Sequence, residues 1–274
     1  MLYRTHHTRI AECCSWPGRQ PIEGAESDGL ARFPDEIRRR RAIDQHRGAT
    51  RIRGHAPARR DQSFRRIHIP DDPIRNDADF DKLMNNIRRA MFEAIDRVMT
   101  CKPDYLILGM SSETFWDGLD GSMRLRERVE AHAGIKVAMG SDASQAALRR
   151  LGDIRRIGVI TPYMPLGDAQ VRRFFSDCGF EVVRLKGLQC ESPVAIAHVS
   201  ERTLRDAILE VDGPDVDAIV QVGTNLIMAQ LAGIAEFWLD KPVMAINTAT
   251  YWYALRQNGI EDKLDGFGSL LLRF

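Results

Sequence analysis

The chain has 274 residues, of which 44% are hydrophobic and 28% are charged, and its formal charge is +1. That apolar content suffices for a sizeable core in one or two compact domains, and it excludes collagen, coiled coils and wholesale disorder. No stretch approaches the roughly 20 consecutive apolar residues that cross a bilayer, and the amino terminus lacks the apolar run of a signal peptide. We therefore expect a cytoplasmic protein without a membrane partner.

The first 66 residues differ in composition from the remainder. They contain 15 Arg, no Lys and 8 acidic residues, a balance of +7, whereas the rest of the chain carries −6. A stretch without apolar runs cannot offset its ordering entropy, so we predict irregular or disordered structure for residues 1–66. Acidic residues interrupt its arginines and no aromatic residues are interleaved, so nucleic acid is not expected as a partner. Arginine without lysine is also what an out-of-frame reading of a GC-rich gene gives, and this alternative stays open.

From Ile67 onward the pattern is regular. Apolar residues at three- and four-residue spacing from Phe80 to Val98 predict a helix that ends near Thr100. Short apolar runs predict buried strands at 105–108, 137–139, 157–160, 182–185, 218–222 and 243–246. Helical patterns lie between them at 142–151, 168–178, 200–211, 226–238 and 249–258. The alternation of strand and helix predicts an α/β fold with mainly parallel sheets.

The chain also repeats itself. Residues 105–112 (YLILGMSS) align with residues 218–225 (AIVQVGTN), and LRRLG, which ends at Gly152, aligns with LRQNG, which ends at Gly259. The repeat predicts two pseudo-symmetric halves, each with three α/β/α layers.

We place residues 67–118 and 250–274 in the first half and residues 119–249 in the second. Ligands of open α/β sheets bind beyond the carboxyl ends of the strands. An active site is therefore expected in the cleft between the halves.

Neutral hydrogen-bonding side chains follow the predicted strands. They are Ser111, Ser112, Thr161, Tyr163, Thr224, Asn225, Asn247 and Thr248. Backbone N–H groups open toward the start of a helix at such places, which favours an anion, and donors without positive charge suit a carboxylate. The same residue types are preferred helix caps, so capping remains the alternative explanation.

Other motifs are weak. The sequence has no GxGxxG after a strand, no P-loop and no HExxH, so neither a cofactor nor a metal is expected. The five cysteines are odd in number and lack metal-site spacing, so we expect reduced thiols. The acidic stretch Asp117–Gly121 is predicted to be a turn rather than a calcium loop. Cys190, in the loop 187–193, is kept as a candidate reactive thiol.

Several motifs resemble the aspartate/glutamate racemase superfamily, and within it the branch of arylmalonate decarboxylase and maleate isomerase. The resemblance covers about residues 67–274. It rests on LGMSSETFWDG (108–118), RIGVITPY (156–163), VQVGTNL (220–226), KPVMAINTATYWYALRQNG (241–259) and GFGSLL (266–271). It implies two α/β halves with the active site between them and a reaction without a cofactor.

The resemblance also implies roles for particular residues. In the decarboxylase, neutral donors hold one carboxylate while another, in an apolar pocket, leaves as carbon dioxide, and a cysteine then protonates the enediolate. The matching donors of this dioxyanion hole are Ser111, Ser112, Tyr163, Thr224 and Asn225. The two catalytic cysteine positions fall on Met110 and Gly223, so both are vacant, which disfavours racemisation and maleate isomerisation. The family's first strand and its Pro-Ser-Ser-Asn segment are not recognisable in residues 1–66.

We therefore expect a cofactor-independent enzyme that acts on a small carboxylate or dicarboxylate. A decarboxylase, which is a carbon–carbon lyase, is favoured, with Tyr163 or water as the proton donor. An isomerase or racemase of a small dicarboxylate is one alternative, and a catalytically silent carboxylate-binding relative is another. The expected partner is the small-molecule substrate, and a homo-oligomer is left open.

Overall fold

A computed structural model describes residues 10–14 and 62–274 of the chain. Most of the arginine-rich segment, including the run at 38–41, lies outside the described residues. Two parts of residues 1–66 are strands, β1 (Ile10–Cys14) and β2 (Gln62–Arg66), so the prediction of irregular structure was wrong there. Strand β1 pairs with β2 on one side and with β3 (Tyr105–Gly109) on the other. These pairings, rather than the local sequence, make both segments strands.

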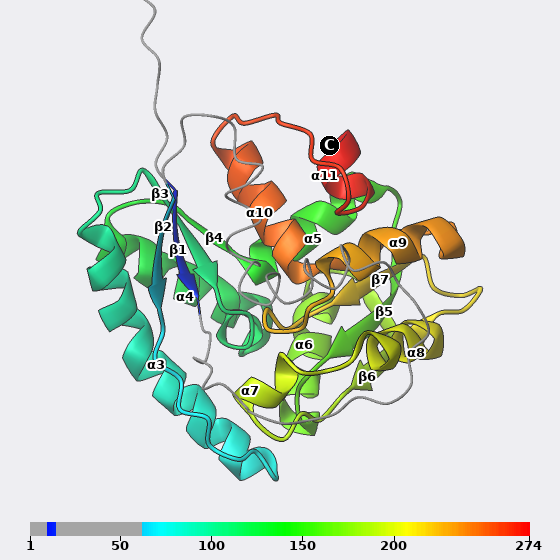
Figure 1. Ribbon diagram of the computed structural model, residues 1–274, viewed down its shortest axis with the longest axis horizontal. Helices are drawn as coiled ribbons and strands as arrows, with labels where there is room; N and C mark the ends of the chain where they lie inside the picture. The colour runs from blue at the N-terminus through cyan, green and yellow to red at the C-terminus, as the bar shows by residue number, and fades with distance from the viewer. Residues whose placement is uncertain (1–9, 15–61) are drawn as a thin grey trace, which may run out of the picture. The chain divides into compact units, whose positions relative to one another are not determined.

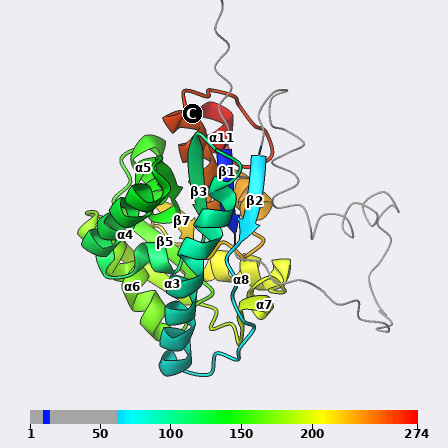
Figure 2. The ribbon, with the colours of Figure 1, turned by 90° about the vertical axis from the view of Figure 1, so that its left-hand side faces the viewer.

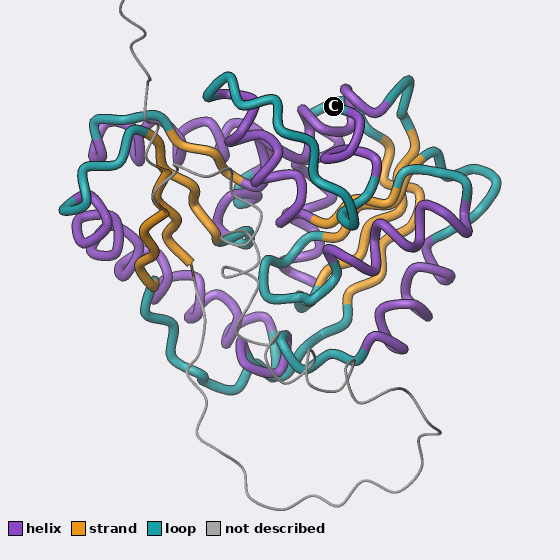
Figure 3. Tube along the Cα trace, turned by 45° about the horizontal axis from the view of Figure 1, so that its top comes forward, coloured by secondary structure: helices purple, strands orange, loops and turns teal. Residues whose placement is uncertain are grey.

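The strands form two four-stranded parallel sheets (Figures 1 and 3). The first sheet has the order β2-β1-β3-β4, and the second has the order β6-β5-β7-β8. The strands not yet given are β4 (Val137–Met139), β5 (Arg156–Thr161), β6 (Glu181–Gly187), β7 (Ala218–Gln221) and β8 (Val243–Ala245). Because each strand of the second sheet takes the place of the strand four earlier, the two halves share one topology, as the repeat predicts.

Helices connect and cover these strands. They are α3 (Asp77–Met99), α4 (Gly118–Ala133), α5 (Gly140–Leu151), α6 (Pro165–Asp177), α7 (Pro193–Ile196), α8 (Glu201–Val211), α9 (Ala229–Leu239), α10 (Ile246–Gln257) and α11 (Ser269–Arg273), with a 3-10 turn, η1, at Glu113–Phe115. Helix α3 begins where the Asn76 side chain accepts a hydrogen bond from the backbone N–H of Asp79, and its apolar stripe is buried as the spacing predicts. Figure 2 shows β1, β2 and β3 side by side.

The boundary between the halves differs from the predicted one. Strand β4 pairs with β3 in the first sheet, although residues 119–249 were assigned to the second half. The reason is helix α4, which the sequence analysis missed and which returns the chain to the same sheet. Asp117, with φ +60°, immediately precedes this helix, so the predicted turn at Asp117–Gly121 is largely the first turn of α4.

The halves meet through helices and an aromatic cluster. An ideal Cβ on Gly140, the first residue of α5, would lie 2.6 Å from Ile246 Cδ1 at the start of α10, so these helices approach closely there. The Phe115 ring of η1 lies 4.9 Å from the Phe174 ring of α6 in an edge-to-face contact, and both side chains are fully buried. These contacts fix the carboxyl ends of β3, β5 and β7 relative to one another. None of the described helices combines the length and the apolar character that a membrane crossing requires.

Candidate active site

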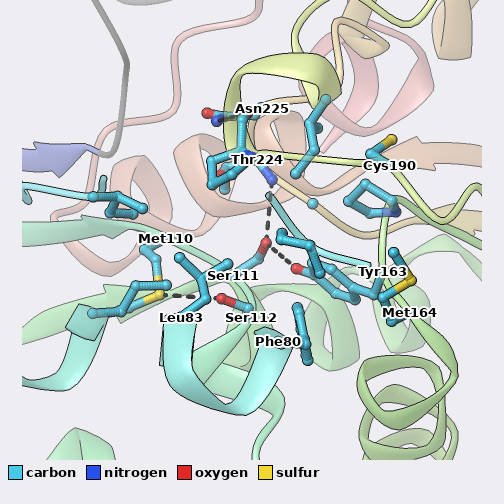
Figure 4. A pocket seen from close by; sticks show the side chains of 17 residues that line it. Phe80, Leu83, Met110, Ser111, Ser112, Tyr163, Met164, Cys190, Thr224 and Asn225 are labelled. Carbon is cyan, nitrogen blue, oxygen red and sulfur yellow. Dashed lines mark hydrogen bonds between the residues drawn. The ribbon is translucent and has the colours of Figure 1, made fainter. Parts of the chain in front are cut away.

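A pocket lies where the loops that follow β3, β5 and β7 meet (Figure 4). With the solvent at its mouth it encloses about 550 Å³ that protein atoms do not fill. Its polar lining comes from Ser111, Ser112, Tyr163, Thr224 and Asn225, which are the five residues predicted to bind a carboxylate. Met110 and Gly223, which the sequence analysis aligned with the two catalytic cysteines of the family, line the same pocket. The structure thus brings the predicted set together.

The Ser111 hydroxyl is the centre of this polar cluster. Its Oγ accepts a hydrogen bond from the backbone N–H of Thr224 at 3.1 Å and lies 2.8 Å from the Tyr163 Oη. Ser111 is only 2% exposed and Tyr163 only 6%. One hydroxyl from the first half therefore joins two strand ends of the second, as the dashed lines in Figure 4 show.

The loop after β7 is held in a conformation that suits glycine. Gly223 has φ +104°, and an ideal Cβ there would lie 2.5 Å from Pro162 Cδ. The Gln221 side chain donates to the Gly223 carbonyl at 2.7 Å, and the Asn247 side chain donates to the Thr224 carbonyl at 2.9 Å. These bonds orient the Thr224 N–H toward the pocket. The close approach of Pro162 leaves no room for a side chain such as that of cysteine at position 223.

Much of the remaining lining of the pocket is apolar. Phe80, Leu83 and Ile87 project from helix α3, and the remaining apolar lining includes Ile69, Ile74, Met164 and Ile196. The Phe80 ring lies 5.6 Å from the Tyr163 ring, so the apolar wall adjoins the polar cluster directly. The sequence analysis assigned the apolar stripe of α3 to the core. No sequence signal separates its pocket-lining residues from those that pack on the sheet.

Among the residues that the structure describes, none that lines this pocket is charged. Burial raises the pKa of the Tyr163 phenol above its ordinary value despite the bond to Ser111, so the phenol is protonated at neutral pH. Cys190, the candidate reactive thiol, also lines the pocket, and burial raises its pKa to about 11. A thiol with that pKa is not a nucleophile at neutral pH.

A half-buried carboxyl, that of Asp168, supports the end of strand β5 next to Tyr163. Asp168 accepts a hydrogen bond from the Thr161 hydroxyl, and Thr161 Oγ1 in turn accepts from the backbone N–H of Tyr163 at 3.1 Å. Burial raises the pKa of the Asp168 carboxyl to about 6. The Thr161 side chain thus fixes the backbone of Tyr163.

Three predicted strand-end residues do not line the pocket: Thr161, Asn247 and Thr248. Thr161 and Asn247 support pocket residues through the hydrogen bonds described above. Thr248 is 5% exposed, and its hydroxyl has no hydrogen-bond partner within the described part of the chain. Among the described residues, no three His, Cys, Asp or Glu side chains are grouped so that they could hold a metal ion.

Solved structures with this fold include maleate isomerases and arylmalonate decarboxylase. A mutant of Nocardia farcinica maleate cis-trans isomerase with a covalently bound succinylcysteine intermediate is similar with a TM-score of 0.77 and 16% identity over 98% of this chain and 100% of that one. A variant of Pseudomonas putida S16 maleate isomerase with maleate has a TM-score of 0.71 and 18% identity, over 97% of this chain and 98% of that one. A double mutant of arylmalonate decarboxylase in the liganded form has a TM-score of 0.71 and 19% identity, over 96% of this chain and 98% of that one. These similarities show the fold.

The family is shown by the sequence itself. The family model for arylmalonate decarboxylase matches residues 80–271, which include the strand-end motifs that line the pocket. No curated protein matches the chain. The match extends over more than half of the sequence and agrees with the doubled parallel fold, so the chain belongs to the arylmalonate decarboxylase family.

Proposed function

We propose that the protein decarboxylates a small malonate that carries an apolar substituent, and that it does so without a cofactor. The observation that carries the proposal is that one pocket combines a neutral polar cluster with an apolar wall, and that the described part of its lining has no charged residue. A malonate needs both environments, because one carboxylate must be held while the other loses its solvation. Membership of the family supports the same reaction class.

The polar cluster is suited to the carboxylate that stays. The Thr224 N–H and the Tyr163 hydroxyl, which now meet at Ser111 Oγ, would turn to a substrate oxygen, and the Ser111 and Ser112 hydroxyls can rotate to donate as well. Asn225 lies beside them, where its amide now donates to the Pro193 carbonyl at 3.3 Å. Neutral donors in a buried site stabilise the enediolate that develops, without neutralising the charge that drives carbon dioxide out.

The apolar wall is suited to the carboxylate that leaves. Placed among Phe80, Leu83 and Ile87, a carboxylate loses water and gains no cation, which destabilises it relative to neutral carbon dioxide. The carbon–carbon bond then breaks, its electron pair remains on the substrate as the enediolate, and carbon dioxide departs. The substituent of the malonate occupies the rest of the wall.

Protonation of the enediolate carbon completes the reaction. We assign the proton to Tyr163, because its phenol is buried, protonated and in contact with the polar cluster. The phenolate that remains takes a proton from water. The pocket thiol, Cys190, is the competing donor.

The pocket disfavours isomerase or racemase activity, but it does not separate a decarboxylase from a catalytically silent relative. A maleate isomerase or a racemase of a dicarboxylate needs a thiolate, and the positions of both family cysteines are occupied by Met110 and Gly223. A catalytically silent carboxylate-binding relative would have the same polar cluster. The experiment must therefore separate catalysis from binding.

The test is carbon dioxide release from a panel of malonates with hydrogen, methyl, butyl or phenyl at the central carbon, with maleate as the isomerisation control. We expect release that increases with the apolar area of the substituent, and no conversion of maleate to fumarate. Tyr163→Phe should lower kcat at least tenfold and also raise KM, because the same hydroxyl holds the carboxylate, whereas Cys190→Ala should change neither. Binding of the same malonates without release by the native protein would support the silent relative, and conversion of maleate would support the isomerase.

A further inference from the structure

Helix α9 presents an apolar stripe to solvent. Ile234 is 58% exposed, Phe237 91% and Trp238 39%, and Ile227, in the loop just before the helix, is 50% exposed. Phe237 and Trp238 follow Ile234 by three and four residues, which places these three side chains on one side of the helix. Figure 1 shows α9 on the outside of the second half, far from α3.

The opposite side of α9 is already packed. Met228, Ala232 and Ala235 are fully buried in the core of the second half. The helix is therefore apolar on both sides, which is the pattern of a helix that is covered from both directions. A single exposed apolar residue is ordinary on a protein surface, whereas a continuous apolar stripe that includes a phenylalanine 91% exposed marks an interface.

The stripe also lacks charge. Glu236 is the charged residue within α9, and its carboxylate is turned to α11, where it accepts hydrogen bonds from the Ser269 N–H at 2.6 Å and from the Ser269 hydroxyl at 2.9 Å. The remaining polar side chain on the exposed side is the neutral Gln230.

We propose that the α9 stripe, formed by Ile227, Ile234, Phe237 and Trp238, is the centre of a two-fold interface with a second copy of this chain. In an isologous contact each residue meets the same patch on the partner, so any charged patch would repel itself. The uncharged stripe meets this condition. A partner of opposite charge would instead require charged groups on this surface, and the stripe has none.

The size of the stripe is sufficient for such a contact. With about 150–250 Å² for each side chain, the exposed fractions give roughly 450 Å² of apolar surface per copy. A standard interface buries about 800 Å² per partner, of which about 65% is apolar in homodimers. The stripe thus supplies most of the apolar centre, and the neighbouring polar surface supplies the rim.

The test is the oligomeric state of the full chain, measured by light scattering after gel filtration and by sedimentation from about 1 to 100 μM. We expect a dimer for the native protein and a monomer for Phe237→Glu and for Ile234→Glu, each with the native far-UV circular dichroism. The matched control is Met123→Glu on α4, where the side chain is 40% exposed and lies outside the stripe. It should remain a dimer.

Three results would overturn the proposal: a native protein that stays monomeric at 100 μM, a dimer that survives both stripe substitutions, or a control that dissociates equally. Hydrogen exchange on the native protein identifies other occupants. If the native protein is a monomer and the backbone amides of α9 exchange slowly, another part of the same chain covers the stripe. Because oligomeric state is measured without a substrate, this test is independent of the proposed decarboxylation.

Discussion

Replacing Ser111 by Ala should destabilise the protein, because the serine hydroxyl joins the two halves. The substitution removes the acceptor of the Thr224 N–H, 3.1 Å away, and the partner of the Tyr163 Oη, 2.8 Å away. Tyr163 is 6% exposed, so its hydroxyl cannot turn fully to water. A buried polar group left without its partner costs about 1–3 kcal/mol. We therefore expect a loss of about 2 kcal/mol in the free energy of unfolding.

For a chain of this size, that loss lowers the melting temperature by roughly 4–8 °C, since about 1 kcal/mol corresponds to 2–4 °C. Calorimetry and urea unfolding both measure it. The matched control is the adjacent Ser112→Ala, because the Ser112 hydroxyl makes only a weak contact of 3.6 Å with Met110 Sδ. It should change stability by less than about 0.5 kcal/mol.

A double-mutant cycle isolates the contact itself. Combining Ser111→Ala with Tyr163→Phe should give a coupling energy of about 1 kcal/mol, because the second substitution removes the hydroxyl that the first leaves without a partner. Equal melting temperatures for the two serine variants, or additive effects in the cycle, would refute the reasoning.

Three further substitutions test other features of the fold. Gly223→Ala should lower the free energy of unfolding, measured in urea titrations, by about 1–3 kcal/mol, because φ is +104° and the new Cβ would lie 2.5 Å from the Pro162 ring. The control Gly259→Ala should cost less, because φ there is +66° and the new Cβ would have no neighbour within 4 Å among the described residues. Gly140→Ala should cost about 1–3 kcal/mol by overpacking, and Ile246→Val should recover part of that loss in the double variant. Asp168 keeps its proton in the folded state up to pH about 6, against an ordinary pKa of 3.8, so native stability should fall as pH rises from about 4 to 6. Asp168→Asn should flatten that part of a stability profile measured by calorimetry, and an unchanged slope would contradict the assignment.

The regular part of the fold could be predicted because its strands are short apolar runs between amphipathic helices. β3 and β7 were found as a repeat because both are buried on two sides and end in similar residues. β1 and β2 were not, because IAECC and QSFRR have no continuous apolar run and become strands by pairing with their neighbours. α4 was missed because its arginines and glutamates obscure an apolar face of only Leu125 and Val129.

The polar part of the candidate site was predictable for a similar reason. Its residues follow strands, and the carboxyl ends of parallel strands must lie at one edge of each sheet. The apolar wall was not predictable, because Phe80 and Ile87 belong to the same helical stripe as core residues such as Met84. Which of them meets the cavity depends on how α3 lies against the second half, and the spacing of residues contains no such information.

Because the Ser111 hydroxyl joins the two halves, a ligand that binds at this place should change the stability of the protein. A carboxylate that engages the Thr224 N–H and the Tyr163 hydroxyl would bind groups that come together only in the folded chain, because they belong to segments 52 and 113 residues distant from Ser111. Such a ligand binds the native state alone, so at a hundred times its dissociation constant it adds about 2.7 kcal/mol to the unfolding equilibrium. A library of carboxylates can therefore be ranked by how much each compound raises the stability of the protein, before any product is known.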